Sequence, residues 1–170
     1  VFDADALNIV SKHPELLELR VGAPNILTPH EGEAARLLGR KVQDRVADAL
    51  EIARRYSAIA VLKGPKTLIA SPEGTVYENT SAGPELAKAG TGDVLAGIIG
   101  ALAAQGLGML DAASLGVHLH GLAGSLAARQ MGVNAVLPED PDEILGTAQQ
   151  LQQVLMMYNC AIREVKTKLE

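Results

Sequence analysis

The fold is decided by the stretch AIAVLK at residues 58–63, an uninterrupted apolar run that ends in a lysine. A short continuous apolar run is typical of a β-strand that is buried on both faces, as in the centre of an α/β sheet. Just upstream, Asp44 is placed to cap a helix that extends through Tyr56. A helix that leads into a doubly buried strand predicts an α/β fold with a mostly parallel sheet.

The segments upstream of this helix continue the alternation of strand and helix. The stretch PNILT at residues 24–28 predicts a short strand, and Pro29 forces an extended exit from it. A helix is predicted from near Gly32 to Gly39, a residue type that ends helices. The opening VFDADAL at residues 1–7 predicts a buried strand end that runs into a helix. Since no Met begins the chain, we expect an upstream segment to be missing.

The segments downstream predict a hairpin and two apolar helices. The stretches KTLIAS at residues 66–71 and TVYEN at 75–79 are separated by a turn and predict an antiparallel hairpin at a sheet edge. The segments Ala89–Gln105 and Asp111–Arg129 predict helices that are apolar nearly all round. Such helices must be enclosed by other elements.

The length favours one domain over residues 1–170, because compact domains commonly have about 100 to 200 residues. A last amphipathic helix is predicted over Asp142–Tyr158. Residues 156–170 are expected to form a charged C-terminal tail.

The composition excludes several classes of protein. A net charge of −5, with one Phe, three Tyr and no Trp, disfavours nucleic-acid binding. The apolar stretch between Val94 and Ala128 is interrupted too often for a membrane span of about 20 residues, which predicts buried helices and no membrane partner. The single cysteine, Cys160, excludes an internal disulfide and fits a reducing, cytoplasmic setting.

The strongest chemical signal is AGTGD at residues 89–93, directly before an apolar helix. The small residues Gly90, Thr91 and Gly92 allow backbone N–H groups to converge on an anion at the positive end of a helix. Asp93 is out of place in such an anion site unless it accepts a proton from an attacking hydroxyl, which describes phosphoryl transfer. The alternative is an ordinary helix start, with glycine for the turn and aspartate for the first N–H groups.

Two further clusters carry candidate functional side chains. His30 and Glu33 are three residues apart at a helix start, where they can face the same side and Glu33 could hold Mg²⁺ through water. The alternative is a helix cap with a solvated histidine. The loop Lys63-Gly64-Pro65-Lys66-Thr67 suits phosphate or nucleotide contact, and its alternative is an ordinary β-turn.

Taken together, five motifs resemble the ADP- or ATP-dependent NAD(P)H-hydrate dehydratases of the ribokinase-like superfamily. They follow one another in the family's order: DADAL (3–7), TPHEGEAARLLG (28–39), VLKGPKT (61–67), ELAKAGTGDVLAGIIGALAAQG (85–106) and GVHLHGLAGSLAA (116–128). The resemblance implies a three-layer sandwich. It also implies that the chain is the C-terminal portion of a domain of about 270 residues, lacking the N-terminal part.

The resemblance implies a lyase that returns hydrated NADH or NADPH to the active cofactor by phosphoryl transfer from ADP or ATP, followed by elimination. In this family Asp93 matches the catalytic base and a substrate contact, and Gly90, Thr91 and Gly92 match the anion hole. His30 matches a substrate-binding histidine and stands where the related kinases carry Asn. The nucleotide contacts match Lys63, Gly64, Pro65, Lys66, Thr67 and Gly92, and Glu33 matches an acidic residue near Mg²⁺.

The resemblance also implies a homo-oligomer, with a tetramer among the expected forms, and a fused or separate epimerase. Two alternatives remain open from the residues alone. One is a ribokinase-like kinase of vitamin precursors, which would release a stable phosphorylated product. The other is a non-catalytic nucleotide-binding fragment.

Overall fold

A computed structural model describes residues 1–19, 24–81 and 90–131 of the chain. Ten elements follow one another in these residues: α1 (Asp5–Lys12), α2 (Glu15–Glu18), β1 (Ile26–Leu27), α3 (Glu31–Leu38), α4 (Arg45–Arg55), β2 (Ile59–Leu62), β3 (Leu68–Ala70), β4 (Val76–Glu78), α5 (Thr91–Ala104) and α6 (Met109–Met131). The predicted helix over Asp142–Tyr158 and the tail at 156–170 lie outside the described residues.

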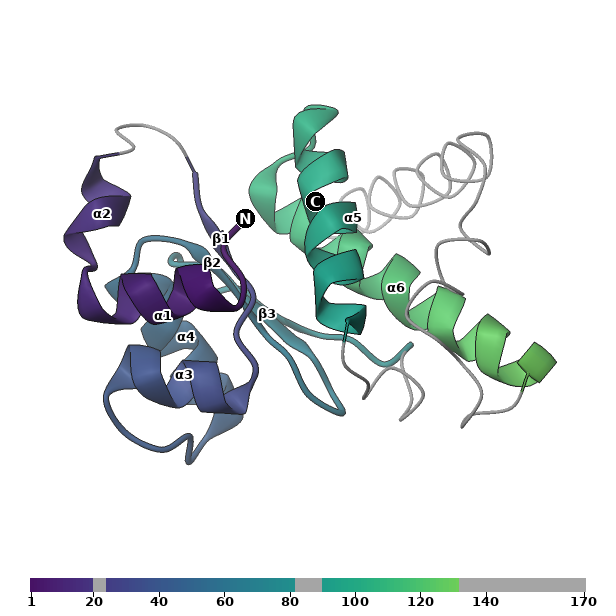
Figure 1. Ribbon diagram of the computed structural model, residues 1–170, viewed down its shortest axis with the longest axis horizontal. Helices are drawn as coiled ribbons and strands as arrows, with labels where there is room; N and C mark the ends of the chain where they lie inside the picture. Colours follow the sequence, from purple (N-terminus) through teal and green to yellow (C-terminus); the bar gives the residue numbers. More distant parts are fainter. Residues whose placement is uncertain (20–23, 82–89, 132–170) are drawn as a thin grey trace, which may run out of the picture.

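The sheet has the order β1-β2-β3-β4 and lies between two helical layers (Figure 1). β1 and β2 are parallel, and an isolated bridge adds Phe2 in parallel to Leu27. The hairpin of β3 and β4 is antiparallel and ends the sheet at β4, as predicted. In the described residues the sheet is therefore mixed. The parallel pair β1–β2 is extended by β3 and β4, and the short connections before these two strands permit only antiparallel pairing.

The central strand β2 is buried along its whole length, which confirms the prediction from residues 58–63. Alternate side chains of the strands face opposite layers. Ala60 and Leu62 pack with the layer of α1, α3 and α4, whereas Ile59 and Val61 pack against α5 and α6. The result is the expected three-layer sandwich, with a hydrophobic core on each face of the sheet.

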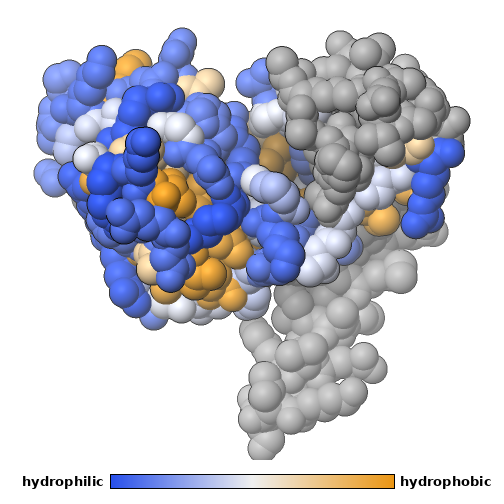
Figure 2. Space-filling view, turned by 90° about the horizontal axis from the view of Figure 1, so that it is seen from below, coloured by the Kyte–Doolittle hydropathy of each residue, from blue (hydrophilic) through white to orange (hydrophobic). Residues whose placement is uncertain are grey.

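The two apolar helices pack closely against each other. A Cβ on Gly116 of α6 would lie 2.6 Å from Cγ1 of Ile99 on α5, so only glycine permits this approach. α6 begins two residues earlier than predicted and extends past the predicted end to Met131, the last described residue. None of the described helices is long and apolar enough to cross a bilayer. On the face seen in Figure 2, hydrophilic residues cover most of the described surface, and hydrophobic ones gather in smaller patches.

The N-terminal ends of α3 and α4 are fixed by side-chain caps. Asp44 accepts hydrogen bonds from the N–H groups of Val46 and Ala47, so the predicted cap of α4 is confirmed. Asp48, one turn later, is buried and accepts from the Gln43 N–H at 2.7 Å and from Arg40 at 2.7 Å. These bonds tie the incoming loop to the first turn of α4.

Replacing Asp48 with Asn should lower the free energy of unfolding by about 2 kcal/mol near neutral pH, since it removes a buried, charge-assisted contact. Burial raises the pKa of Asp48, but bonds from Arg40 and Gln43 outweigh this and hold that pKa below its ordinary value. The stabilisation should therefore be present above pH ~4 and be lost as the pH falls through the lower pKa of the folded state.

Urea unfolding of the wild type and of Asp48→Asn, from neutral pH to below pH ~4, tests the prediction. The control is Glu51→Gln, which removes the more exposed partner of Arg40 and should cost at most about 1 kcal/mol. An equal cost for Asp48→Asn at low and neutral pH would contradict the ionic role of Asp48.

Candidate active site

The carboxyl ends of the parallel strands β1 and β2 lie beside the residue that follows the Phe2 bridge, and together they supply the polar residues of the site. Asp3 follows the Phe2 bridge, His30 follows β1 by a short loop, and Lys63 directly follows β2. The Lys63 N–H donates to the Pro29 carbonyl at 2.8 Å, which joins two of these ends. Ligands of open α/β sheets bind beyond the carboxyl ends of such strands.

The ammonium of Lys63 lies between two carboxylates. Its Nζ is 2.7 Å from Oδ1 of Asp3 and 3.9 Å from Oε2 of Glu33. The three side chains are largely buried, with exposed fractions of 20% for Lys63, 13% for Asp3 and 6% for Glu33. Because desolvation strengthens electrostatic interactions, this cluster fixes the Lys63 side chain at the strand ends.

The first turn of α5 packs against this cluster. A Cβ on Gly92 would lie 3.3 Å from Nζ of Lys63 and 3.5 Å from Oδ2 of Asp3. Gly90 starts the helix in the left-handed conformation, with φ of 91°, and its carbonyl accepts from the Asp93 N–H at 3.1 Å. The structure thus brings Gly92, the last residue of the predicted anion hole, close to the lysine of the predicted nucleotide loop, although the two are far apart in the sequence.

Asp93 lies in the first turn of α5 with its side chain exposed, whereas Thr91 is buried. The Asp93 side chain is therefore not part of the hydrophobic core. Asp93 is the residue directly after Gly92, which approaches Lys63. A carboxylate in this place can accept a proton from a group that approaches the strand ends.

His30 and Glu33 form a reciprocal capping box at the start of α3. Nδ1 of His30 accepts from the Gly32 N–H at 2.9 Å and the Glu33 N–H at 3.4 Å, while Glu33 Oε2 accepts from the His30 N–H at 2.8 Å. The helix-cap alternative is therefore part of the structure. Nε2 of His30 lies 3.5 Å from Oε1 of Glu33, so the two side chains share one side as predicted, and His30 is 57% exposed.

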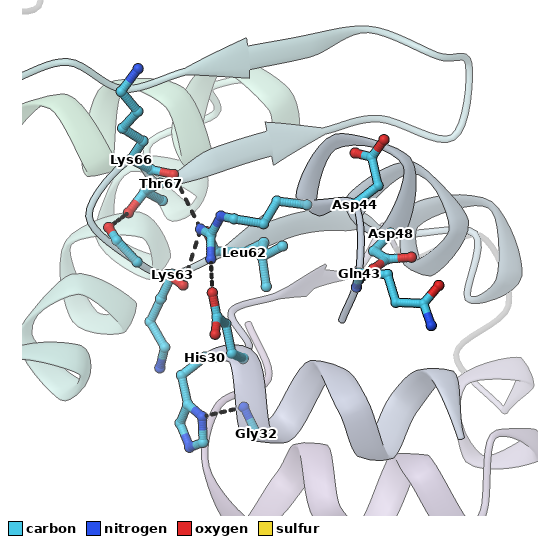
Figure 3. A network of polar contacts seen from close by, with 12 residues as sticks. His30, Gly32, Gln43, Asp44, Asp48, Leu62, Lys63, Lys66 and Thr67 are labelled. Carbon is cyan, nitrogen blue, oxygen red and sulfur yellow. Dashed lines mark hydrogen bonds and ion pairs between the residues drawn. The ribbon is translucent and has the colours of Figure 1, made fainter. Parts of the chain in front are cut away.

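The loop Lys63-Gly64-Pro65-Lys66-Thr67 sends its two lysines in opposite directions (Figure 3). Lys63 points to Asp3, whereas Nζ of Lys66 is 3.0 Å from Oε1 of Glu78 on β4 and is 69% exposed. The Thr67 hydroxyl donates to the Gly64 carbonyl at 3.2 Å and closes the loop.

The side chains at the strand ends include carboxylates, which are ligands of the kind that Mg²⁺ prefers. Within 1–19, 24–81 and 90–131, no group of three or more His, Cys, Asp or Glu is arranged to hold a metal ion. Mg²⁺ does not require such a group, because it takes one or two carboxylates and completes its shell with water and phosphate oxygens. The carboxylates of Glu33 and Asp3 both lie near Nζ of Lys63. Carboxylate oxygens are ligands that Mg²⁺ accepts.

Two residues of this region were not given a role from the sequence. Asp3 was noted only as part of the DADAL motif, although its place after a strand end could have suggested a site residue. No sequence motif points to Arg45, yet its guanidinium contacts the carbonyls of Leu62, Lys63 and Lys66.

Comparisons with known proteins agree on the family. The family model described as NAD(P)H-hydrate dehydratase matches residues 1–146. An ADP-dependent (S)-NAD(P)H-hydrate dehydratase from Neisseria meningitidis is 49% identical over 142 residues, which cover 81% of this chain and 48% of the relative. The bifunctional NAD(P)H-hydrate repair enzyme Nnr of Moorella thermoacetica is 50% identical over 144 residues, covering 82% of this chain and 27% of that protein. The chain thus spans half or less of the length of these relatives.

Solved structures agree on the fold. The ADP/ATP-dependent NAD(P)H-hydrate dehydratase of Bacillus subtilis, co-crystallised with ATP and Mg²⁺, matches with a TM-score of 0.71 and 32% identity, over 77% of this chain and 48% of that chain. A ribokinase-like superfamily protein from Enterococcus faecalis matches with a TM-score of 0.72 and 29% identity, over 85% and 49%. The fold is therefore ribokinase-like, and the chain belongs to the NAD(P)H-hydrate dehydratase family.

Proposed function

We propose that this chain carries the phosphoryl-transfer site of an ADP- or ATP-dependent dehydratase that returns NAD(P)H hydrate to NAD(P)H. The observation that carries the proposal is the close approach of Gly92 to the Lys63–Asp3 ion pair, where an added Cβ would lie 3.3 Å from Nζ of Lys63, with the exposed Asp93 following directly in the same helical turn. A cation to hold phosphate and a neighbouring base are the two parts that phosphoryl transfer to a hydroxyl needs.

In the proposed reaction, the N–H groups of Gly90, Thr91 and Gly92 and the loop Lys63–Thr67 hold the nucleotide phosphates. Asp93 accepts the proton of the hydrate's hydroxyl as its oxygen attacks the terminal phosphorus. The bond between that phosphorus and the bridging oxygen breaks, so AMP leaves from ADP, or ADP from ATP. The carbon–oxygen bond then breaks, the neighbouring ring carbon loses a proton, and phosphate leaves with the oxygen. Mg²⁺, held through water by Glu33, would neutralise phosphate charge.

The reaction can be followed by the near-ultraviolet absorbance of the dihydronicotinamide. The full-length protein, incubated with the hydrate of NADH or NADPH and with ADP or ATP, should restore this absorbance only when a nucleotide is present. No recovery with either nucleotide would refute the proposal, and a stable phosphorylated product would favour a kinase.

The same proposal includes the cellular setting. The relative from Moorella thermoacetica is named as a bifunctional repair enzyme, which supports an epimerase that acts beside this site, fused or separate. We place the enzyme in the cytoplasm as a homo-oligomer, with residues 1–170 forming part of a single domain. Gel filtration with light scattering measures the oligomeric state.

His30→Asn should separate the capping role of His30 from its proposed contact with the substrate. Asn is a preferred capping residue, so the free energy of unfolding should change by less than about 1 kcal/mol. Loss of the imidazole should raise the KM for the hydrate about tenfold, and the KM for the nucleotide should stay unchanged. Steady-state kinetics and thermal melting measure the two effects. The control is His13→Asn at an exposed site, and an unchanged KM for the hydrate in His30→Asn would contradict the substrate role.

A further inference from the structure

Arg45 lies at the N-terminus of α4, where a positive charge does not stabilise the helix. It is the first residue of α4, directly after the Asp44 cap, and its side chain is 27% exposed. The start of a helix carries the positive end of the dipole, which disfavours arginine there. The contacts that keep its guanidinium in place therefore lie outside α4.

These contacts bind the guanidinium to the loop at residues 63–67. Its Nη2 lies within hydrogen-bond distance of the carbonyls of Leu62, Lys63 and Lys66, at 3.3, 3.4 and 3.2 Å. Its Nη1 pairs with Glu31, the residue after the His30 cap. Figure 3 shows this network, with Leu62, Lys63, Lys66 and Thr67 around its upper part and His30 below.

Gly64 lies directly against this guanidinium. A Cβ on Gly64 would lie 2.5 Å from Nη2, 2.8 Å from Nη1 and 2.9 Å from Cζ of Arg45. Any larger residue at position 64 must displace either the loop or the arginine. Gly64 does not adopt a left-handed backbone conformation, so its backbone does not require glycine. The close approach of Arg45 is therefore the reason for glycine at this position.

We propose that Arg45 is the positioning residue of the nucleotide loop. It draws three carbonyl oxygens, the negative ends of the peptide dipoles, toward itself and away from the position of a phosphate. Among the described residues, no acceptor contacts the N–H groups of Gly64 and Lys66, which leaves them to the nucleotide. Through Glu31 the same guanidinium sets this loop against the start of α3, which His30 caps. This inference rests on the proposed function and adds the residue that organises its nucleotide side.

The test measures the dissociation constants of ADP and ATP by calorimetry, together with steady-state kinetics, on the full-length protein. Arg45→Gln should weaken nucleotide binding about tenfold and raise the KM for nucleotide equally, while kcat and the KM for the hydrate change less than about twofold. Arg45→Lys should not rescue binding, because a single ammonium cannot match the guanidinium fork. The matched control is Arg54→Gln, an exposed arginine on the same helix, which should bind as the wild type does.

Gly64→Ala provides the second arm. If it acts by displacing Arg45, it should weaken binding by a similar factor, and the double variant Arg45→Gln/Gly64→Ala should bind no worse than either single variant. Unchanged nucleotide binding in Arg45→Gln, or additive losses in the double variant, would overturn the inference. Binding is measured without the hydrate, so wild-type protein that binds nucleotide but restores no cofactor would refute the proposed function alone.

Discussion

Asp93→Asn should lower kcat about 1000-fold and leave the affinity for the nucleotide unchanged or slightly higher. The amide keeps the shape of the side chain but cannot accept the proton of the attacking hydroxyl, and general base catalysis contributes about 100- to 10,000-fold. Because Asp93 is exposed in the first turn of α5, the loss of its charge should cost only about 0.5 kcal/mol of stability.

A matched control exists in the other apolar helix. Asp111 is also an exposed aspartate in a first helical turn, at the start of α6, and makes no part of the proposed site. Asp111→Asn should therefore repeat the small effect on stability without the loss of turnover. If Asp93→Asn retained kcat within about tenfold of the wild type, Asp93 would not be the base, and the non-catalytic alternative would gain.

Lys63→Met should raise the KM for the nucleotide about 100-fold, because it removes the cation and leaves two carboxylates that repel phosphate. The two carboxylates belong to Asp3 and Glu33, which are both largely buried beside Nζ of Lys63. The same change should lower the free energy of unfolding by about 3 kcal/mol, since it leaves charges without their partner.

Two further variants separate binding from stability. Lys66→Met removes only the side chain of the neighbouring lysine, whose ammonium pairs with Glu78, and keeps the Lys66 N–H that we propose faces the nucleotide. The KM for the nucleotide should therefore change at most about threefold. Lys63→Met combined with Asp3→Asn should recover stability without recovering nucleotide binding. Equal effects of Lys63→Met and Lys66→Met on the KM would contradict the distinction that the structure makes between the two lysines.

The elements that sequence predicted well are those set by local patterns. The doubly buried β2, the hairpin of β3 and β4 and the Asp44 cap follow from apolar runs, turn residues and capping chemistry within a few positions. The end of α3 at Gly39 is of the same kind, with φ of 73°. Each of these features needs no information from distant parts of the chain.

The contacts that build the site are long-range and could not be predicted in detail. The Lys63–Asp3 pair joins residues 60 positions apart. This pair holds Lys63 at the strand ends, whereas Lys66 pairs with Glu78, and the sequence alone does not distinguish the two lysines. The approach of Gly92 to Lys63 depends on how α5 crosses the strand ends. The capping role of His30 depends on the ring rotamer, because histidine is not among the preferred capping residues.

The most direct test of phosphoryl transfer uses a hydrate whose ring hydroxyl carries oxygen-18. If the hydroxyl attacks the nucleotide's terminal phosphorus and phosphate then leaves with that oxygen, the released phosphate must contain the label, which mass spectrometry detects. We expect one labelled oxygen in each phosphate formed. Label recovered in water, with unlabelled phosphate, would contradict the proposed chemistry.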